Sequence, residues 1–182
     1  MRSADGLRYD RRTIALHWAT AALVLFLWIW AHAIDRFPKG PLLVDARSIH
    51  IVVGAALLMV VGWRISWRWM GGMVIARRQN PAEQIAALVQ RLLYILLLVT
   101  LALGLINTSV RGDILFGLVS IPPLGSYGAD ARHALSESIT GWHAVAANAV
   151  LLVAGGHAAM ALIHEFAWRD GRLQRMLPGG ET

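Results

Sequence analysis

Three histidines lie in one strongly apolar stretch near the end of the chain, GWHAVAANAVLLVAGGHAAMALIHEF, residues 141 to 166. His143, His157 and His164 are separated by 14 and 7 residues. In an α-helix, 14 residues advance about 21 Å and return close to the starting face, so His143 and His157 face one way at two depths. Imidazole nitrogens bind metals and transfer protons near neutral pH, so this spacing indicates metal or proton chemistry.

The helix face between His143 and His157 carries mainly small side chains: Ala146, Ala147, Val150 and Ala154. Small residues let helices pack closely. They also leave room for a flat macrocycle, and a cleared face with a histidine at each end is harder to obtain from packing alone. The pattern therefore favours haem binding.

The elements that position these histidines must be membrane helices. The 182-residue chain is 57% apolar and only 15% charged, with eight tryptophans, which is unlike an ordinary soluble domain. Crossing the hydrocarbon layer takes roughly 20 helical residues. Four windows qualify: residues 13–34, 48–69, 92–110 and 139–163. The composition and short loops predict an all-α fold: one domain over residues 1–182, a transmembrane four-helix up-down-up-down bundle in contact with membrane lipid.

The basic residues predict the orientation of the bundle. Four Lys or Arg precede the first span, five lie in the last turns of span two or between spans two and three, and three follow span four, against three and two in the other connections. The positive-inside rule therefore places both termini in the cytoplasm. The net charge of +6 is explained by arginines facing anionic lipid, without nucleic acid as a partner. Because the chain has no cysteine, disulfides, iron–sulfur clusters and c-type haem attachment are excluded.

Spans one and two each supply a partner histidine at a matching depth. His17, near the start of span one, lies level with His157, and His50, near the start of span two, lies level with His143. The predicted arrangement is two haems b, one between His17 and His157 and one between His50 and His143. Gly54, one turn after His50, would let a porphyrin edge approach the backbone. An iron held by two imidazoles has no vacant site, so its chemistry is electron transfer.

Other roles for these histidines stay open at this point. Buried intramembrane histidines also serve as proton relays, as ligands of bare zinc or copper, or as packing residues. His32 and His133 are expected to be solvated, and His164 is expected to contact a substrate or support a ligand. Four arginines near helix ends are candidates for pairing with haem propionates or for anchoring in headgroups: Arg12, Arg47, Arg64 and Arg91. The longest expected loop, residues 111–138, is a candidate for a surface helix or lid.

Several motifs together resemble the bacterial cytochrome b561 family of small four-helix dihaem proteins, over nearly the whole chain. They are HW at residues 17–18, HIVVG at residues 50–54, WR at residues 63–64, LLYILLL followed by glycine in span three, and WHAVAANAVLLVAGGHAAMALIHEFAWRDGRLQRML at the end. The last stretch is the most specific, because it joins three histidines and the W-R-D…R-M tail in one order.

The resemblance implies a multi-pass protein of the bacterial inner membrane that transfers electrons to or from a quinone. Within the family, the chain resembles the characterised type that oxidises superoxide and reduces ubiquinone. This implies ligand roles for His17, His50, His143 and His157. It also suggests that His164, with Trp168 and Arg169, borders a quinone pocket on the cytoplasmic side, with His164 as a contact or proton donor.

Two departures from the family pattern affect the quinone site. Gln90 stands four residues before Tyr94, where related sequences often carry a histidine, and residues 71–84 lack lysine. If a quinone carbonyl is bound by that segment, Arg77 or Arg78 must replace lysine, and the guanidinium differs in geometry and hydration. On the outer side, five basic residues face five acidic ones, so attraction of an anionic donor such as superoxide requires local clustering.

The alternative function is a cytochrome b subunit that relays electrons between a redox partner protein, either a dehydrogenase or a soluble carrier, and the quinone pool. The short loops argue mildly against a large docking surface. A structural or transport bundle without redox activity is a third reading, and it predicts a colourless protein.

Overall fold

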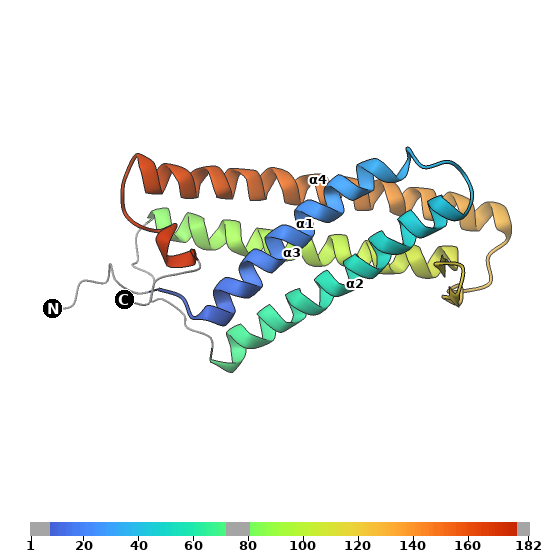
Figure 1. Ribbon diagram of the computed structural model, residues 1–182, viewed down its shortest axis with the longest axis horizontal. Helices are drawn as coiled ribbons and strands as arrows, with labels where there is room; N and C mark the ends of the chain where they lie inside the picture. Colours follow the sequence, from blue (N-terminus) through green and yellow to red (C-terminus); the bar gives the residue numbers. More distant parts are fainter. Residues whose placement is uncertain (1–7, 72–80, 178–182) are drawn as a thin grey trace.

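The computed structural model describes residues 8–71 and 81–177, and in them it places four long helices (Figure 1). The helices are α1 (Arg11–Ile34), α2 (Pro41–Met70), α3 (Pro81–Arg111) and α4 (Ala129–Phe166). A small antiparallel hairpin of β1 (Ile114–Leu115) and β2 (Val119–Ser120) follows α3, and a short 3-10 helix, η2 (Gln174–Met176), follows α4. Each long helix is long and apolar enough to cross a membrane, which confirms the predicted fold class.

Local sequence signals set the helix ends. Asp10 caps α1, since its Oδ1 accepts the Thr13 backbone N–H at 2.9 Å and its Oδ2 accepts the Thr13 hydroxyl at 2.6 Å. α2 and α3 both begin with a proline, which has no backbone N–H to leave unsatisfied. α2 ends at Gly71, whose φ of 121° is accessible to glycine because it has no Cβ.

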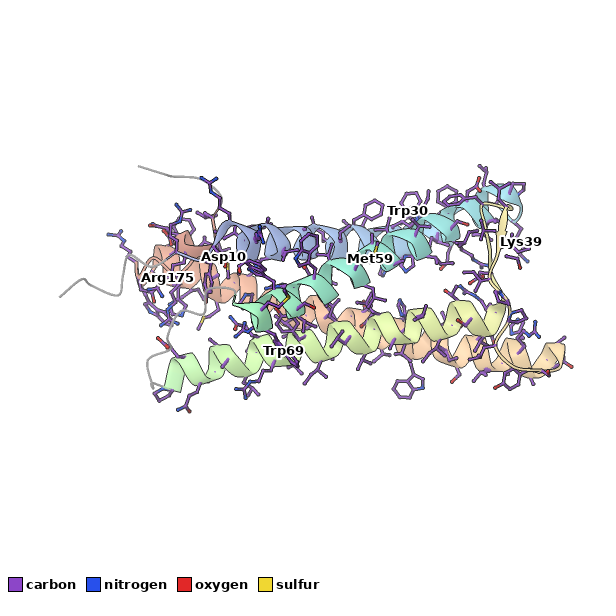
Figure 2. All side chains as sticks on the ribbon, turned by 90° about the horizontal axis from the view of Figure 1, so that it is seen from below. Asp10, Trp30, Lys39, Met59, Trp69 and Arg175 are labelled. Carbon is purple, nitrogen blue, oxygen red and sulfur yellow. The ribbon has the colours of Figure 1, made fainter. Side chains whose placement is uncertain are left out.

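The helices pack as two antiparallel pairs, α1 with α2 and α3 with α4, and α2 also contacts α3. Figure 2 shows the pairs as two layers along one long axis. A hydrogen bond from Trp28 Nε1 to Asn148 Oδ1, 2.9 Å long, joins α1 to α4 across the layers. We call the end that carries Arg11 and Phe166 the terminal end, and the end that carries β1 and β2 the hairpin end.

The helices extend beyond the predicted spans, and one predicted loop is wrong. α3 begins at Pro81, eleven residues before the predicted start, and α4 begins at Ala129. The apolar windows detect only the part that lies in hydrocarbon, whereas the backbone hydrogen bonds of a helix continue into polar sequence. The connection expected over residues 111–138 is therefore only 112–128. It holds a hairpin and the irregular segment IPPLGSYG, with no surface helix.

The buried core lies midway along the bundle, between the two histidine levels. Its centre is formed by Leu57, Val61 and Leu97, and partly buried apolar residues pack around them: Leu23, Val24, Leu27, Ile65 and Leu101. Leu57 is seven residues after His50 and Val61 is three before Arg64. An apolar layer from α1, α2 and α3 therefore separates the two levels.

Most of the remaining apolar surface is exposed in the isolated chain. Leu152 is 79% exposed, Met59 70% and Trp142 64%. In a soluble protein so much apolar surface would drive association, whereas on spanning helices it faces lipid tails. The chain is a multi-pass membrane protein whose lipid contacts are made by these outward faces.

Candidate functional site

The histidine pair at the hairpin end is brought together from α2 and α4. The ring centroids of His50 and His143 are 6.1 Å apart, and the ring planes are inclined at 71°. An imidazole nitrogen binds a first-row metal at about 2 Å and lies about 1 Å from its ring centre, so two imidazoles on opposite sides of one metal have centroids about 6 Å apart. The spacing of this pair fits bis-imidazole ligation of a haem iron.

α3 fixes the tautomer of His143. The Nδ1 atom of His143 lies 2.9 Å from the Thr100 carbonyl oxygen. A carbonyl can only accept, so Nδ1 carries the proton and Nε2 keeps the lone pair that a metal requires. This approach depends on Gly104, because a Cβ there would lie 3.1 Å from Cε1 and 3.4 Å from Nδ1 of His143.

We expect Gly104→Ala to push the His143 ring away from α3 and weaken its bond to Thr100. Loss of the group that orients a metal-bound histidine typically lowers metal affinity about 10- to 100-fold, and we expect the lower part of that range for haem at this pair. Haem content after detergent washing and the electron paramagnetic resonance signal of the oxidised protein measure the effect. Gly62→Ala is the matched control, since a Cβ at Gly62 meets nothing within 4 Å. Equal haem retention in both variants would contradict the role given to Gly104.

His50 has an unsatisfied nitrogen. Its Nδ1 is buried and has no hydrogen-bond partner among the described residues. The Ala46 carbonyl, one turn earlier, already accepts a 2.8 Å hydrogen bond from Trp30 Nε1. An unpaired buried nitrogen is costly, so this imidazole suits a site in which a bound group provides its partner. Gly54, one turn further, has nothing within 4 Å of an added Cβ, in agreement with the space expected there.

The pair at the terminal end is less closely arranged. His17 and His157 lie within range of each other's charge, but no ring contact like that of His50 and His143 joins them among the described residues. Instead, Arg64 Nη2 lies 3.1 Å from His17 Nδ1, and the same guanidinium lies over the Tyr94 ring, 5.3 Å from its centre. A guanidinium only donates, so the neutral His17 ring carries its proton on Nε2. For Nε2 to bind a metal, its proton must move to Nδ1, so the contact between Arg64 and Nδ1 must break.

Each pair has one arginine within electrostatic range of both rings. Arg64 acts on His17 and His157, and Arg111 acts on His50 and His143. A guanidinium inside a membrane protein needs an anionic or hydrogen-bonding partner. The two carboxylates of a haem have the chemistry to supply one, so the donor set at both levels fits this group. Clusters of three or more potential ligands for a bare metal ion are absent from the described residues.

Cationic side chains gather in a pocket of about 670 Å³ at the hairpin end. Arg47 lies three residues before His50 and Thr140 three before His143, so the pocket opens beside that pair. The lining residues come from α2, the end of α3, the connection before α4 and the first part of α4: Arg47, Arg111, Tyr127, Ala129, Arg132, His133, Ser136, Glu137 and Thr140. Three arginines against one glutamate among these residues give a local excess of positive charge, which the balanced count of outer charges cannot reveal.

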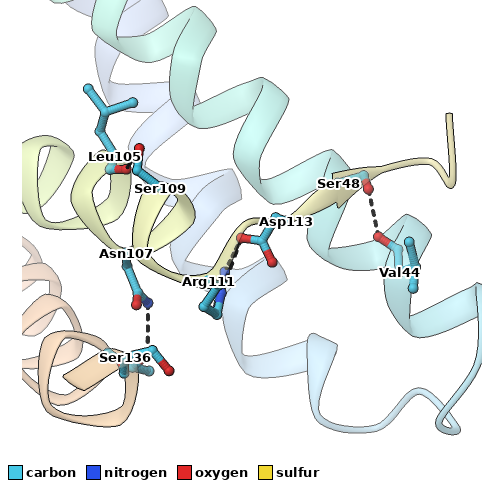
Figure 3. Close-up of polar contacts among 9 residues, drawn as sticks. Val44, Ser48, Leu105, Asn107, Ser109, Arg111, Asp113 and Ser136 are labelled. Atoms are coloured by element: carbon cyan, nitrogen blue, oxygen red, sulfur yellow. Dashed lines mark hydrogen bonds and ion pairs between the residues drawn. The ribbon is translucent and has the colours of Figure 1, made fainter. Parts of the chain in front are cut away.

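The arginines of this pocket differ in how they are held. Arg111 is bound to Asp113, with Nη2 2.8 Å from Oδ2 (Figure 3). Arg132 has a buried Nε with no hydrogen-bond partner among the described residues. Ser48, the neighbour of Arg47, links α2 to the turn after β1: its hydroxyl donates to the Val44 carbonyl at 2.7 Å and accepts the Phe116 N–H at 2.8 Å. His133 forms an exposed contact with Glu137, in agreement with its expected solvated position.

At the terminal end, only part of the predicted quinone site can be located. His164 is 8% exposed, and its ring lies against that of Trp168 with 4.4 Å between the centroids. Arg169 is exposed in a left-handed turn with φ of 52°. Arg77 and Arg78 lie outside the described residues. His32 is exposed, as expected, and its Nδ1 lies 2.8 Å from the Trp28 carbonyl oxygen.

A second cleft lies at the terminal end between α2 and α3. Its volume is about 320 Å³, and it is lined by Ile65, Arg68, Trp69, Ala87, Gln90, Arg91 and Tyr94. Gln90 therefore lies beside a cavity, together with Tyr94 one turn further. Arg12, the remaining arginine considered for haem propionates, lies over the Trp67 ring at 4.6 Å.

A histidine pair held between two spanning helices is typical of membrane cytochromes of the b type, in which imidazoles of the helices bind haem. The chain belongs to the prokaryotic cytochrome b561 family, whose model matches residues 8–179. It is therefore a membrane electron-transfer protein, and family membership implies that it binds haem b.

Two curated proteins show the range of its relatives. The chain is 33% identical to a cytochrome b562 of Cereibacter sphaeroides over 178 residues, which cover 93% of this chain and 94% of that protein. It is 26% identical to a probable superoxide oxidase, CybB, of Yersinia pestis over 177 residues, which cover 94% and 96% of the two chains. Both similarities extend over nearly the whole length.

Proposed function

We propose that the protein carries electrons across the inner membrane through two bis-histidine haems b and reduces a quinone, with superoxide as the electron donor. His50 and His143 would hold one haem and His17 and His157 the other. When bound, such a haem supplies reversible one-electron chemistry without an open coordination site. The 6.1 Å separation of the His50 and His143 rings is the observation that carries this proposal.

The charges support a direction for electron entry. With both termini in the cytoplasm, the hairpin end faces the outside, and its arginine-lined pocket would attract a small anion. The name of the Yersinia pestis relative points to superoxide as that anion. The overall reaction balances when two superoxide ions and two protons convert one quinone to one quinol and two molecules of oxygen.

The residues of the terminal end support quinone reduction on the cytoplasmic side. His164 is the candidate proton donor, held against Trp168. The cleft that contains Gln90 and Tyr94 has a volume within the range of small-molecule sites, about 300 to 1,000 Å³. Arg169, Arg77 and Arg78 are the further side chains proposed to border the quinone.

The decisive experiment adds superoxide to the purified, air-oxidised protein and follows the haem absorbance and quinol formation. The proposal expects haem reduction by superoxide and one quinol for every two superoxide ions consumed. Dithionite shows how much haem is reducible. If dithionite reduces the haem and superoxide does not, the superoxide activity is excluded. The relay function, consistent with the plain cytochrome name of the Cereibacter sphaeroides relative, would then be tested by co-purification of a dehydrogenase or soluble carrier.

We expect Arg47→Gln combined with Arg132→Gln to slow the reduction by superoxide. Electrostatic attraction typically changes association rates by about 10- to 1,000-fold, and removal of two of the pocket's three arginines should cost about tenfold at low salt. Salt screens such attraction, so the difference from wild type should shrink at high ionic strength. Stopped-flow measurements across a salt series test this. Arg36→Gln, an exposed change outside the pocket lining, is the control, and equal rates for it and the double variant would contradict steering by the pocket.

A further inference from the structure

A carboxylate from the C-terminal segment contacts His164 directly. Asp170 Oδ2 lies 2.6 Å from His164 Nδ1, and the His164 side chain is only 11% exposed. A carboxylate oxygen accepts, so Nδ1 is the donor and carries a proton. The contact fixes the tautomer of His164 and leaves Nε2 as the nitrogen that can exchange a proton with another group.

Asp170 is itself held in place by several bonds. Its Oδ2 accepts from Arg172 Nε at 2.8 Å, and its Oδ1 accepts the Arg172 backbone N–H at 3.3 Å. Its own backbone N–H donates to the His164 carbonyl at 3.2 Å. The left-handed conformation of Arg169 reverses the chain so that the carboxylate returns to the end of α4. The carboxylate is therefore positioned by the backbone as well as by its side-chain partners.

Asp170 keeps its negative charge near neutral pH. Partial burial alone would raise the pKa of this carboxyl, but the hydrogen bond and charge of His164, followed by those of Arg172, outweigh burial and lower it. Stability gained from a lowered carboxyl pKa is present above the unfolded pKa and is lost as the pH falls through the folded one. The contact with His164 therefore persists through the neutral range and weakens only in acid.

His164 lies on the helix face that also carries His157. Seven residues of α-helix advance about 10 Å and return to within about 20° of the same direction. The imidazole is packed on one side by Trp168 and bound at Nδ1 by Asp170. A buried imidazole held in this way can deliver a proton from Nε2 without reorienting, which is what general acid catalysis requires.

We infer that Asp170 is a positioning residue for proton delivery: it holds His164 by Nδ1 and stabilises the charged imidazole, so that Nε2–H is available to a quinone oxygen. This inference rests on the proposed function. As the quinone accepts its two electrons, one of its two protons leaves Nε2, and the neutral ring keeps the Nδ1–H bond to Asp170. Water then returns the proton to Nε2.

The other charged groups at this end set the background for the pH dependence. They are Glu165 on α4, Arg169, Arg172 and Arg175 in the C-terminal segment, Glu83 and Arg91 on α3, Arg64 and Arg68 on α2, and Arg8, Asp10, Arg11 and Arg12 at or just before the start of α1. Glu165 offers a matched comparison, because it is the next residue to His164 and its Oε1 accepts a 2.7 Å bond from Gln174 Nε2.

The test compares Asp170→Asn, Asp170→Glu and Glu165→Gln in the haem-loaded protein. Asp170→Asn removes the charge with little change in shape, so we expect quinone reduction near pH 7 to fall about tenfold, less than the roughly 100-fold expected for loss of the proton donor itself. The alkaline limb of its pH–rate profile, where a proton donor is lost, should move to lower pH. Asp170→Glu should recover most of the rate, and Glu165→Gln should match wild type.

Nitrogen NMR of the dithionite-reduced, diamagnetic protein labelled at histidine gives a readout independent of turnover. We expect the Nδ1–H form of His164, assigned by its loss in His164→Ala, to dominate in wild type and to lose population in Asp170→Asn. An unchanged pH profile and tautomer in Asp170→Asn would overturn the inference. So would a slowed variant that melts at lower temperature and is not rescued by glutamate, since that result indicates a purely structural role. If the wild-type protein reduces no quinone while Asp170→Asn still shows the tautomer change, the proposed function is excluded and the role of Asp170 in holding His164 remains.

Discussion

His143→Ala is expected to keep about half of the wild-type haem, with the lost half coming from the hairpin-end pair. Each iron is proposed to depend on its own two imidazoles, so a missing ring leaves His50 as a single ligand at that level. His157→Ala is the mirror variant and should lose the haem of the terminal end. Haem-to-protein ratios and redox titrations of the two variants measure this, and each should retain a different one of the two wild-type potentials.

The selectivity of these losses follows from the layer between the two levels. Leu57, Val61 and Leu97 fill the middle of the bundle, so collapse at one pair need not be transmitted to the other. His133→Ala is the control, since this histidine lies on the same helix as His143 but is exposed and contacts Glu137 at the surface. Simultaneous loss of both haems from either single variant, or full retention in His143→Ala, would disprove separate coordination.

The sequence predicts the fold and the depth of the histidines well, because both depend on periodicity. Apolar windows locate the four helices, and the 14-residue spacing on α4 places His143 and His157 on one face. The partner of His143 follows from depth alone, and the structure does place His50 beside it. The ligand role of these residues stays a prediction that the haem measurements test.

Other parts of the site could not be predicted, because they depend on groups without a sequence pattern. The Thr100 carbonyl that orients His143 is a backbone group, which every residue has. The space that Gly104 leaves for the His143 ring is visible only once α3 and α4 are packed. Asp170 reaches His164 through a left-handed turn at Arg169, a residue type that rarely adopts that conformation. A count of charges in the sequence gives the number of arginines on the outer side but does not show that three of them line one pocket.

The two histidine levels also differ in a way that only the structure reveals. At the hairpin end, a backbone carbonyl leaves Nε2 of His143 free for a metal, whereas at the terminal end Arg64 occupies Nδ1 of His17. Haem binding at the terminal end therefore requires a rearrangement of a charged side chain and a change of tautomer. This predicts that the hairpin-end pair binds haem first when the cofactor-free protein is titrated with haem.

His164→Ala is expected to keep both haems and to lower the rate of quinone reduction about 100-fold. General acid groups typically contribute about 10²- to 10⁴-fold, and the lower end is expected here because water at the membrane surface can supply protons more slowly. His164 is seven residues beyond His157 and is bound to Asp170, so its loss leaves the proposed iron ligands in place. Reduction of haem by superoxide should be unchanged, which separates this variant from those of the arginine pocket.

Single-turnover kinetics distinguish the two stages in His164→Ala. Haem prereduced anaerobically with one equivalent of dithionite is mixed with quinone, and reoxidation is followed by absorbance as a function of pH. Wild type should reoxidise faster as the pH falls, because quinol formation consumes protons that His164 delivers, whereas the variant should depend on pH only weakly. His32→Ala is the control, because it removes an exposed histidine from the hairpin end of α1, far along the bundle from His164. A variant that reoxidises at the wild-type rate would show that the proton of quinol formation enters by another route and that the contact with Asp170 serves only to close the end of α4.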